Sequence, residues 1–250
     1  MTTKNLKLHL AEKLTDVTND WRTILVEAFT NMDATYLTFL IENNHFIPDK
    51  NNFLNAFKNI NLKQTRYILF GQDPYPRKES AIGEAFIDGA VKTIWSENGL
   101  SKEVNKATSL RNFIKMLILS HNLLGKESLS QKNIAKINKQ NLIQTIFDLR
   151  DNFVSNGVLL INTSLIFTDK KDTSYHIKNW KPFFEKILSF LPNEIYLILL
   201  GNFAKKYVSS LKQAQKMKKI EFEHPYNVSF VYSKQVQCFF RSMQLIFKKS

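Results

Sequence analysis

The sequence predicts a three-layer α/β/α protein of one domain, in which helices cover both faces of a central four-stranded parallel sheet. Four short runs rich in β-branched, leucine and aromatic side chains have the length of buried strands: residues 67–70, 158–161, 195–200 and 220–223. Stretches of helical periodicity separate these runs, and parallel neighbours need such crossovers. With 250 residues and 44% hydrophobic content the chain can build one sizeable core, so residues 1–250 are assigned to a single domain.

The segment before the first strand is predicted to be helical. Apolar side chains at positions 21, 24, 25, 28 and 29 recur at the spacing of one helix face, within a helical region over residues 6–40. Pro48 and Asp49 are typical of a helix start and precede the apolar residues Phe53 and Phe57. This helix leads into the strand 67–70.

The segment between the first two strands contains one predicted helix and two irregular stretches. Glycine and asparagine interrupt residues 89–107, which are predicted to form a loop. Thr108 or Ser109 then caps a helix that begins LRNFIKMLIL. Residues 121–145 are polar and lysine-rich, which predicts an insertion or an exposed connection that could present a surface to a protein partner.

Helices again separate the remaining strands. Leu142, Ile146 and Leu149 belong to a predicted helix that ends near the Asn156-Gly157 pair. Another helix is expected over residues 180–190, and a further one follows Gly201. Residues 236–247 are predicted to close the chain as a helix.

The charge of the chain points to a polyanionic partner. Thirty-five basic residues against 22 acidic ones give a net charge of +13 and favour nucleic acid, although a lysine-rich compositional bias explains part of the excess. The polar start MTTKNLKLHL lacks the apolar stretch of a secretory signal, and no apolar run approaches the roughly 18 residues of a membrane span. We therefore expect a cytoplasmic protein that does not enter a membrane.

Cysteine and histidine usage argues against a metal site. The single cysteine, Cys238, excludes an intrachain disulfide and a four-cysteine cluster, and its phenylalanine neighbours predict a buried, inert thiol. The five histidines, at positions 9, 45, 121, 176 and 224, show no spacing typical of metal ligands. No metal and no organic cofactor are expected.

Polar side chains follow each of the four predicted strands. They are Gln72 and Asp73 after the first strand, Asn162 after the second, Gly201-Asn202 after the third and His224 after the fourth. Ligands of parallel α/β sheets bind beyond the carboxyl ends of the strands. The pattern therefore predicts a carboxylate, an amide and an imidazole around one pocket.

These groups suit hydrolysis of a glycosidic bond. The chain has no serine or cysteine in a nucleophile elbow and no glycine-rich phosphate loop, which disfavours acyl transfer, nucleotide hydrolysis and dinucleotide redox chemistry. A carboxylate can orient water and stabilise a cationic sugar while an imidazole stabilises the departing anion. An asparagine amide offers one donor and one acceptor, which suits the edge of a base.

Five blocks resemble the signature motifs of the uracil-DNA glycosylases whose first motif is GQDPYH. The blocks are GQDPYP at 71–76, GEAF at 83–86, LLINTSL at 159–165, LILLGN at 197–202 and HPYNVS at 224–229. They occur in family order, and the likeness extends over about residues 46–247 without the 121–145 segment. The resemblance implies excision of uracil from single- or double-stranded DNA by a monomer.

The resemblance also implies roles for individual residues. Asp73 would activate water and stabilise the sugar cation, and neutral His224 would donate to the uracil O2. Asn162 would read the uracil edge, Phe86 would stack on the flipped base, Tyr75 would reject thymine and Gln72 would line the pocket. The predicted DNA-binding residues are Pro76, Ser109, Gly201, Asn202, Val228 and Ser229.

Departures from the family pattern fall on the DNA-gripping loops. Pro76 replaces the usual histidine, the loop before Ser109 lacks its prolines, and Val228 stands where the family inserts a leucine into the minor groove. We therefore expect an active enzyme with an altered grip on DNA that relies more on general electrostatics.

Two other functions stay open on the sequence alone. One is a DNA-binding or replication-accessory scaffold that keeps the fold, and the other is a glycosylase for another modified base. The pairing of Tyr75 with Asn162 disfavours the scaffold, because a scaffold needs no base-selective pocket. The space that Tyr75 leaves beside C5 of the base decides between uracil and another base.

Overall fold

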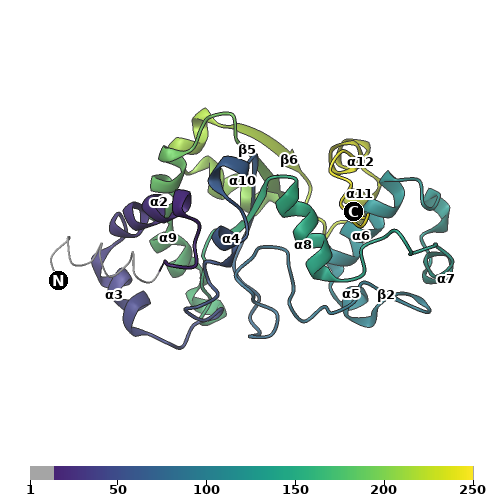
Figure 1. Cartoon of the computed structure of the whole chain (residues 1–250), viewed down its shortest axis with the longest axis horizontal. Helices are drawn as coiled ribbons and strands as arrows, with labels where there is room; N and C mark the ends of the chain where they lie inside the picture. Colours follow the sequence, from purple (N-terminus) through teal and green to yellow (C-terminus); the bar gives the residue numbers. More distant parts are fainter. Residues whose placement is uncertain (1–13, 250) are drawn as a thin grey trace.

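The computed structural model describes residues 14–249, and a four-stranded parallel sheet lies at the centre of this part of the chain (Figure 1). The strands are β1 (Tyr67–Gly71), β4 (Val158–Asn162), β5 (Tyr196–Leu200) and β6 (Lys218–Phe222), in the order β4-β1-β5-β6. All neighbouring pairs are parallel. The predicted fold class is confirmed, and the last strand begins two residues before its predicted start at 220.

Successive side chains of the central strand β1 point to opposite faces of the sheet, so both faces need a cover. Ile68 and Phe70 join the core on one face, whereas Leu69 joins the core on the other. Figure 1 shows α2, α3 and α9 gathered on one side of the sheet and α6, α11 and α12 on the other. A parallel strand buried on both faces reads as a continuous apolar run, which is the pattern in the sequence.

The helices form two groups, one on each face of the sheet. The first face is the one that Ile68 and Phe70 join, and the second is the one that Leu69 joins. The first group is α2 (Asn19–Thr30), α3 (Ala34–Glu42), α4 (Asn55–Lys58), α9 (Thr173–Phe190) and α10 (Gly201–Ser209). The second group is α5 (Lys102–Lys106), α6 (Thr108–Ser120), α7 (Gln131–Ala135), α8 (Ile146–Ser155), α11 (Val228–Tyr232) and α12 (Lys234–Arg241). Short 3₁₀ turns occupy η1 (Leu62–Gln64), η2 (Lys126–Ser128), η3 (Lys170–Asp172) and η4 (Gln213–Lys216).

Of the predicted helical region 6–40, residues 6–13 lie outside the described residues. The rest forms two helices, α2 from Asn19 and α3 from Ala34, with non-helical turns at 14–18 and 31–33. The helix expected from Pro48 begins only at Asn55, because hydrogen-bonded turns occupy residues 50–54. Helix α6 starts at the predicted place, but its N-cap is Ala107 and neither Thr108 nor Ser109 caps it. Helix α9 begins at Thr173, seven residues before its predicted start.

The predicted loop at 89–107 contains a small antiparallel ribbon of β2 (Trp95–Ser96) and β3 (Gly99–Leu100), followed by α5. Its two-residue turn is Glu97-Asn98, and Gly99, the first residue of β3, has a φ of +123°. The Trp95 indole N–H donates to the Ile143 carbonyl over 2.6 Å, which joins the ribbon to the 121–145 segment.

The 121–145 segment is more closely integrated than an exposed connection. Ile134 and Ile143 are fully buried in the core of the second face, and Ser130 caps α7 through its hydroxyl. Four lysines, at positions 126, 132, 136 and 139, surround these buried isoleucines in the sequence, so the composition of the segment gave no sign of them. The helix expected from Leu142 begins at Ile146, with Thr145 and Asp148 forming its capping box.

Two expectations at the C-terminus are wrong. Helix α12 ends at Arg241, and the chain then returns so that the Ile246 carbonyl accepts the Ile143 N–H over 3.0 Å. Cys238 is exposed. The buried face of α12 carries Val236 and Phe240 four residues apart, and Cys238 lies between them on the opposite face. Within residues 14–249, no helix has the length and apolar character needed to cross a membrane.

Candidate active site

A cavity of about 190 Å³ opens at the carboxyl ends of the strands. All six residues predicted to act on the base or sugar line it, together with Ser109 from the predicted DNA-binding set. The full lining is Gly71, Gln72, Asp73, Tyr75, Glu84, Phe86, Ser109, Asn162 and His224. The structure therefore brings together side chains from the ends of β1, β4 and β6, as the polar residues that follow the predicted strands indicate.

Asp73 follows β1, and its carboxyl group is held by a residue 100 positions later in the chain. The Thr173 hydroxyl, at the first residue of α9, donates to its Oδ2 over 3.2 Å. Burial raises the pKa of the Asp73 carboxyl, and the Thr173 hydrogen bond opposes that rise. The next residue, Pro74, is buried and restricts the backbone of Asp73 to extended conformations.

His224 follows β6, and its tautomer is fixed by the backbone. The Tyr226 N–H donates to His224 Nδ1 over 3.1 Å, so in the neutral ring the proton is on Nε2. Burial lowers the pKa of His224, which favours that neutral form. The ring therefore presents one N–H donor to the cavity without a positive charge.

The loop that carries His224 is held by α6 and by a glycine. Asn112, buried on α6, donates to the Pro225 carbonyl over 2.8 Å and to the Tyr226 carbonyl over 3.2 Å. Gly201 has a φ of +84°, and a Cβ there would lie 2.8 Å from the His224 Cβ. A side chain at position 201 would therefore displace the imidazole.

Asn162 is the last residue of β4 and is paired in register with Gly71. A Cβ on Gly71 would lie 2.2 Å from Asn162 Oδ1, so only glycine leaves room for this amide. The Gln72 carbonyl accepts the Thr163 hydroxyl over 2.6 Å and the Thr163 N–H over 3.1 Å. These bonds tie the exits of β1 and β4 together behind the cavity.

Phe86 projects into the cavity from a strained backbone. Its φ of +67° is rare for a non-glycine residue and typical of positions that the surrounding structure enforces. The preceding residue, Ala85, donates its N–H to the Leu160 carbonyl over 3.1 Å, and the Phe86 ring lies 6.4 Å from the His224 ring. Tyr75 lines the cavity beside it, and burial raises its pKa to about 12, so the phenol stays neutral.

The remaining predicted DNA-binding residues lie outside the cavity. Pro76, Asn202, Val228 and Ser229 are exposed, whereas Gly201 is buried beneath His224. The Ser229 hydroxyl donates to the Glu223 carboxylate. This places a negative charge beside a hydroxyl that was predicted to meet a phosphate.

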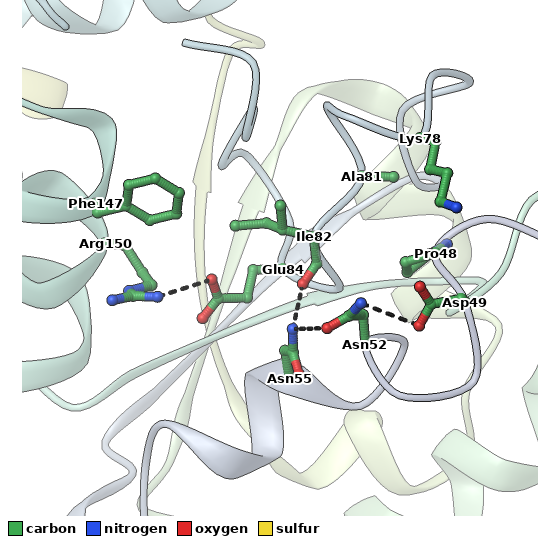
Figure 2. Close-up of a pocket in the computed structure, with 10 residues that line it drawn as sticks. All are labelled: Pro48, Asp49, Asn52, Asn55, Lys78, Ala81, Ile82, Glu84, Phe147 and Arg150. Atoms are coloured by element: carbon green, nitrogen blue, oxygen red, sulfur yellow. Dashed lines mark hydrogen bonds and ion pairs between the residues drawn. The ribbon is translucent and has the colours of Figure 1, made fainter. Parts of the chain in front are cut away.

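Glu84 is a buried carboxyl that the sequence-based prediction of site residues does not include. It lines the cavity described above and also a second cavity of about 300 Å³ (Figure 2). The Asn59 amide donates to its Oε1 over 2.7 Å, and Arg150 lies 3.9 Å from its Oε2. Burial raises the pKa of Glu84, and the bond from Asn59 and the charge of Arg150 oppose the rise. Glu84 thus fastens the Phe86 loop to α4 and α8.

The arrangement is suited to splitting a bond between a sugar and an amide-like heterocycle. A carboxylate, a neutral imidazole with one N–H donor, a phenyl ring and an asparagine amide line one small cavity. Among the described residues, no group of three or more histidine, cysteine or acidic side chains has the arrangement of a metal site.

Thr173 is expected to position Asp73 and to set its pKa. We expect Thr173→Val to lower kcat for cleavage of the bond between sugar and heterocycle by roughly tenfold. This is the scale of one hydrogen bond to a charged group. Loss of that bond leaves burial unopposed, so the Asp73 pKa rises further and the acid limb of the pH–rate profile moves to higher pH. Thr173→Ser, which keeps the hydroxyl, should restore both quantities. An unmoved acid limb in Thr173→Val would show that the contact is only structural.

Comparison with known proteins identifies the family. The model of the uracil DNA glycosylase superfamily matches residues 57–245. The chain is 27% identical over 197 residues to a uracil-DNA glycosylase of Campylobacter jejuni, covering 76% of this chain and 72% of that protein. A uracil-DNA glycosylase of Fusobacterium nucleatum is 27% identical over 199 residues, with 77% and 74% covered.

A solved structure agrees over nearly the whole chain. The crystal structure of wild-type UNG from Nitratifractor salsuginis superposes with a TM-score of 0.93 at 41% identity, covering 97% of this chain and 98% of that one. The family match spans both the strands and the loops that build the cavity. The chain belongs to the uracil DNA glycosylase superfamily.

Proposed function

We propose that this protein is a uracil-DNA glycosylase of the type whose first motif reads GQDPYH, and that it hydrolyses the N-glycosidic bond of uracil in DNA. One observation carries the assignment: Asp73, neutral His224, Asn162 and Phe86 line a single cavity at the carboxyl ends of the strands. The related glycosylases of similar length support the same reaction. The uracil nucleotide enters this cavity only after it leaves the base stack.

In this mechanism His224 acts on the departing base and Asp73 acts on the sugar. As the bond between C1′ and N1 breaks, the electron pair leaves with uracil, and the His224 Nε2–H donates to O2 where negative charge develops. The Asp73 carboxylate stabilises the cationic sugar and orients water toward C1′. Water adds its oxygen to C1′ and releases a proton, and the uracil anion takes up one proton, so the products are neutral uracil and an abasic site.

The walls of the cavity select the base. The Asn162 amide accepts from uracil N3–H and donates to O4, while Phe86 stacks on the ring. Tyr75 occupies the side where thymine carries its methyl group, and Gln72 lines the pocket. The DNA backbone then lies over Pro76, Ser109, Gly201, Asn202, Val228 and Ser229, and the enzyme acts as a monomer inside the cell.

Uracil release from matched single- and double-stranded oligonucleotides tests the proposal. Wild-type protein should release free uracil from at least one of the two substrates without added metal or cofactor. DNA binding with no release from either would instead support the scaffold function, in which the 121–145 segment would be the surface for a protein partner. Release of a different base from an otherwise identical oligonucleotide would point to another glycosylase specificity.

Asn162→Asp is expected to relax discrimination against cytosine. The carboxylate offers only acceptors, so the donor to uracil O4 is lost and the exocyclic amine of cytosine gains a partner. A missing buried hydrogen bond costs about 1–3 kcal/mol, so uracil release should fall roughly 5- to 150-fold. Cytosine release should rise above that of the wild type in the same oligonucleotide. Unchanged base preference would exclude the recognition role of Asn162.

A further inference from the structure

A buried histidine on α9 is bonded at both ring nitrogens although it has no place in the cavity. His176 is 2% exposed and lines neither of the two cavities described above. Its Nδ1 lies 2.7 Å from the Tyr36 hydroxyl oxygen, and its Nε2 lies 2.7 Å from the Thr168 hydroxyl oxygen. Two hydroxyl groups from segments far apart in the chain therefore converge on one imidazole, which satisfies it completely.

The direction of each hydrogen bond in this cluster follows from Asp172. The Thr168 hydroxyl donates to Asp172 Oδ2 over 3.2 Å, and a carboxylate can only accept. Because Thr168 has a single hydroxyl proton, its oxygen must accept the His176 Nε2–H, and the Nδ1 of the neutral ring then accepts the Tyr36 O–H. Burial lowers the pKa of His176 and the Asp172 carboxylate opposes that fall, so burial favours the neutral ring that this chain requires.

The two hydroxyl groups that hold the imidazole are themselves on fixed backbone. The Tyr36 N–H donates to Asp33 Oδ1 over 2.9 Å at the start of α3, which lies on the same side of the sheet as α9 (Figure 1). Phe167, which precedes Thr168, exchanges two backbone hydrogen bonds of 2.6 and 2.8 Å with Ile47. The chain of hydrogen bonds thus connects the start of α9 to two anchored segments.

The first turn of α9 also carries the hydroxyl that holds Asp73. Thr173 is the first residue of this helix, and His176 is its first buried residue. Asp172, the N-cap, makes no side-chain bond to the helix backbone, and its carboxylate instead accepts the Thr168 hydroxyl. A first turn without a side-chain cap is prone to fraying. Since Thr173 and His176 are three residues apart on one helix face, the bonds to the imidazole stabilise the turn that presents the Thr173 hydroxyl.

We infer that His176 is a positioning residue for Asp73: its two hydrogen bonds fix the first turn of α9, and this turn places the Thr173 hydroxyl against the Asp73 carboxyl. The inference rests on the proposed function, which gives Asp73 its role, and adds to it a residue that does not reach the cavity. His176 acts on Asp73 only through Thr173, so loss of the imidazole should have the same kind of effect as loss of the Thr173 hydroxyl.

His176→Phe tests the inference, because it keeps a ring against Phe39 and removes both hydrogen bonds. The first turn of α9 then loosens, and the Thr173 hydroxyl opposes the effect of burial on Asp73 less well. The Asp73 pKa should therefore rise, and the acid limb of the pH–rate profile should move to higher pH, as for Thr173→Val. On a uracil-containing oligonucleotide kcat should fall by about 3- to 10-fold, with little change in KM.

A double variant shows whether His176 acts through Thr173. In the Thr173→Val background, His176→Phe should lower kcat by no more than about twofold and should leave the acid limb where Thr173→Val put it. A full second loss would mean that the imidazole acts by another route, and would overturn the inference. Thr168→Val should reproduce His176→Phe, and it carries the same test if His176→Phe does not fold. Thr168→Ser, which keeps the hydroxyl, should behave as the wild type.

The Asp73 pKa, measured by carbon NMR of its carboxyl group, keeps the test independent of catalysis. The matched control is Ile187→Val, because Ile187 is fully buried near the other end of the same helix, and it should leave this pKa unchanged. Wild-type protein that releases no uracil would refute the proposed function, while the NMR titration would still report on the positioning of Asp73. An unmoved Asp73 pKa in folded His176→Phe would overturn the inference even in an active enzyme.

Discussion

Asp73→Asn is expected to lower kcat for uracil release by about 10²- to 10⁴-fold, the range for loss of a positioned acid–base group. Asparagine has almost the same volume, and its amide oxygen can still accept the Thr173 hydroxyl, so the local geometry should survive. What disappears is the negative charge that, in the proposed mechanism, stabilises the sugar cation and orients water. Single-turnover release from a single-stranded oligonucleotide, with binding measured alongside, separates the lost chemistry from any change in affinity.

The pH dependence gives the same variant a second readout. The proposed role of Asp73 requires its ionised form, and burial raises its pKa, so the wild-type rate should rise with pH through a pKa above that of an ordinary carboxyl group. The residual activity of Asp73→Asn should lack this limb. Glu97→Gln is the matched control, because Glu97 is exposed in the β2–β3 turn and its loss changes the net charge equally. If the acid limb of the pH–rate profile persists unchanged in Asp73→Asn, the titration of another group produces that limb.

The polar residues at the carboxyl ends of the strands could be predicted, because the sequence signals for a strand and for its end are local. An apolar run followed by Gly71, Gln72 and Asp73 indicates both the strand and its polar end, and the parallel topology brings Asn162 and His224 to the same edge. By contrast, the β2–β3 ribbon and the early end of α12 depend on contacts with the 121–145 segment, such as the bond between Trp95 and Ile143. Composition showed only the lysines of that segment.

The partners of the proposed catalytic groups could not be predicted, because they are distant in sequence. Thr173 lies 100 residues from Asp73, and Asn112 lies 113 residues from Pro225. The close approach of Gly201 to His224 depends on β5 and β6 being neighbours, which no single segment reveals. Glu84 gave a weak signal, since a charged residue between Gly83 and Ala85 in an apolar run indicates a buried partner.

His224→Ala is expected to lower kcat by about 10²- to 10³-fold, the range for loss of one preorganised donor to a developing oxyanion. The donor is preorganised by the protein itself, since the Tyr226 N–H occupies Nδ1 and burial favours the neutral ring. Alanine removes the Nε2–H and leaves the anion at O2 without a partner. His224→Gln keeps an N–H donor on a side chain of similar reach and should recover part of the loss. His45→Ala, on an exposed surface, is the matched control and should have no effect.

A change of leaving group tests whether His224 acts on the departing base rather than on the fold. The 5-fluorouracil anion is more stable than the uracil anion and depends less on a hydrogen bond at O2. The loss in His224→Ala should therefore be smaller for 5-fluorouracil than for uracil, whereas Asp73→Asn should impair both, because the charge on the sugar is common to them. A His224→Ala defect of the same size on both bases would mean that the imidazole shapes the cavity without stabilising the anion. His224→Ala and Asp73→Asn together thus separate the stabilisation of charge on the base from the stabilisation of charge on the sugar in the transition state.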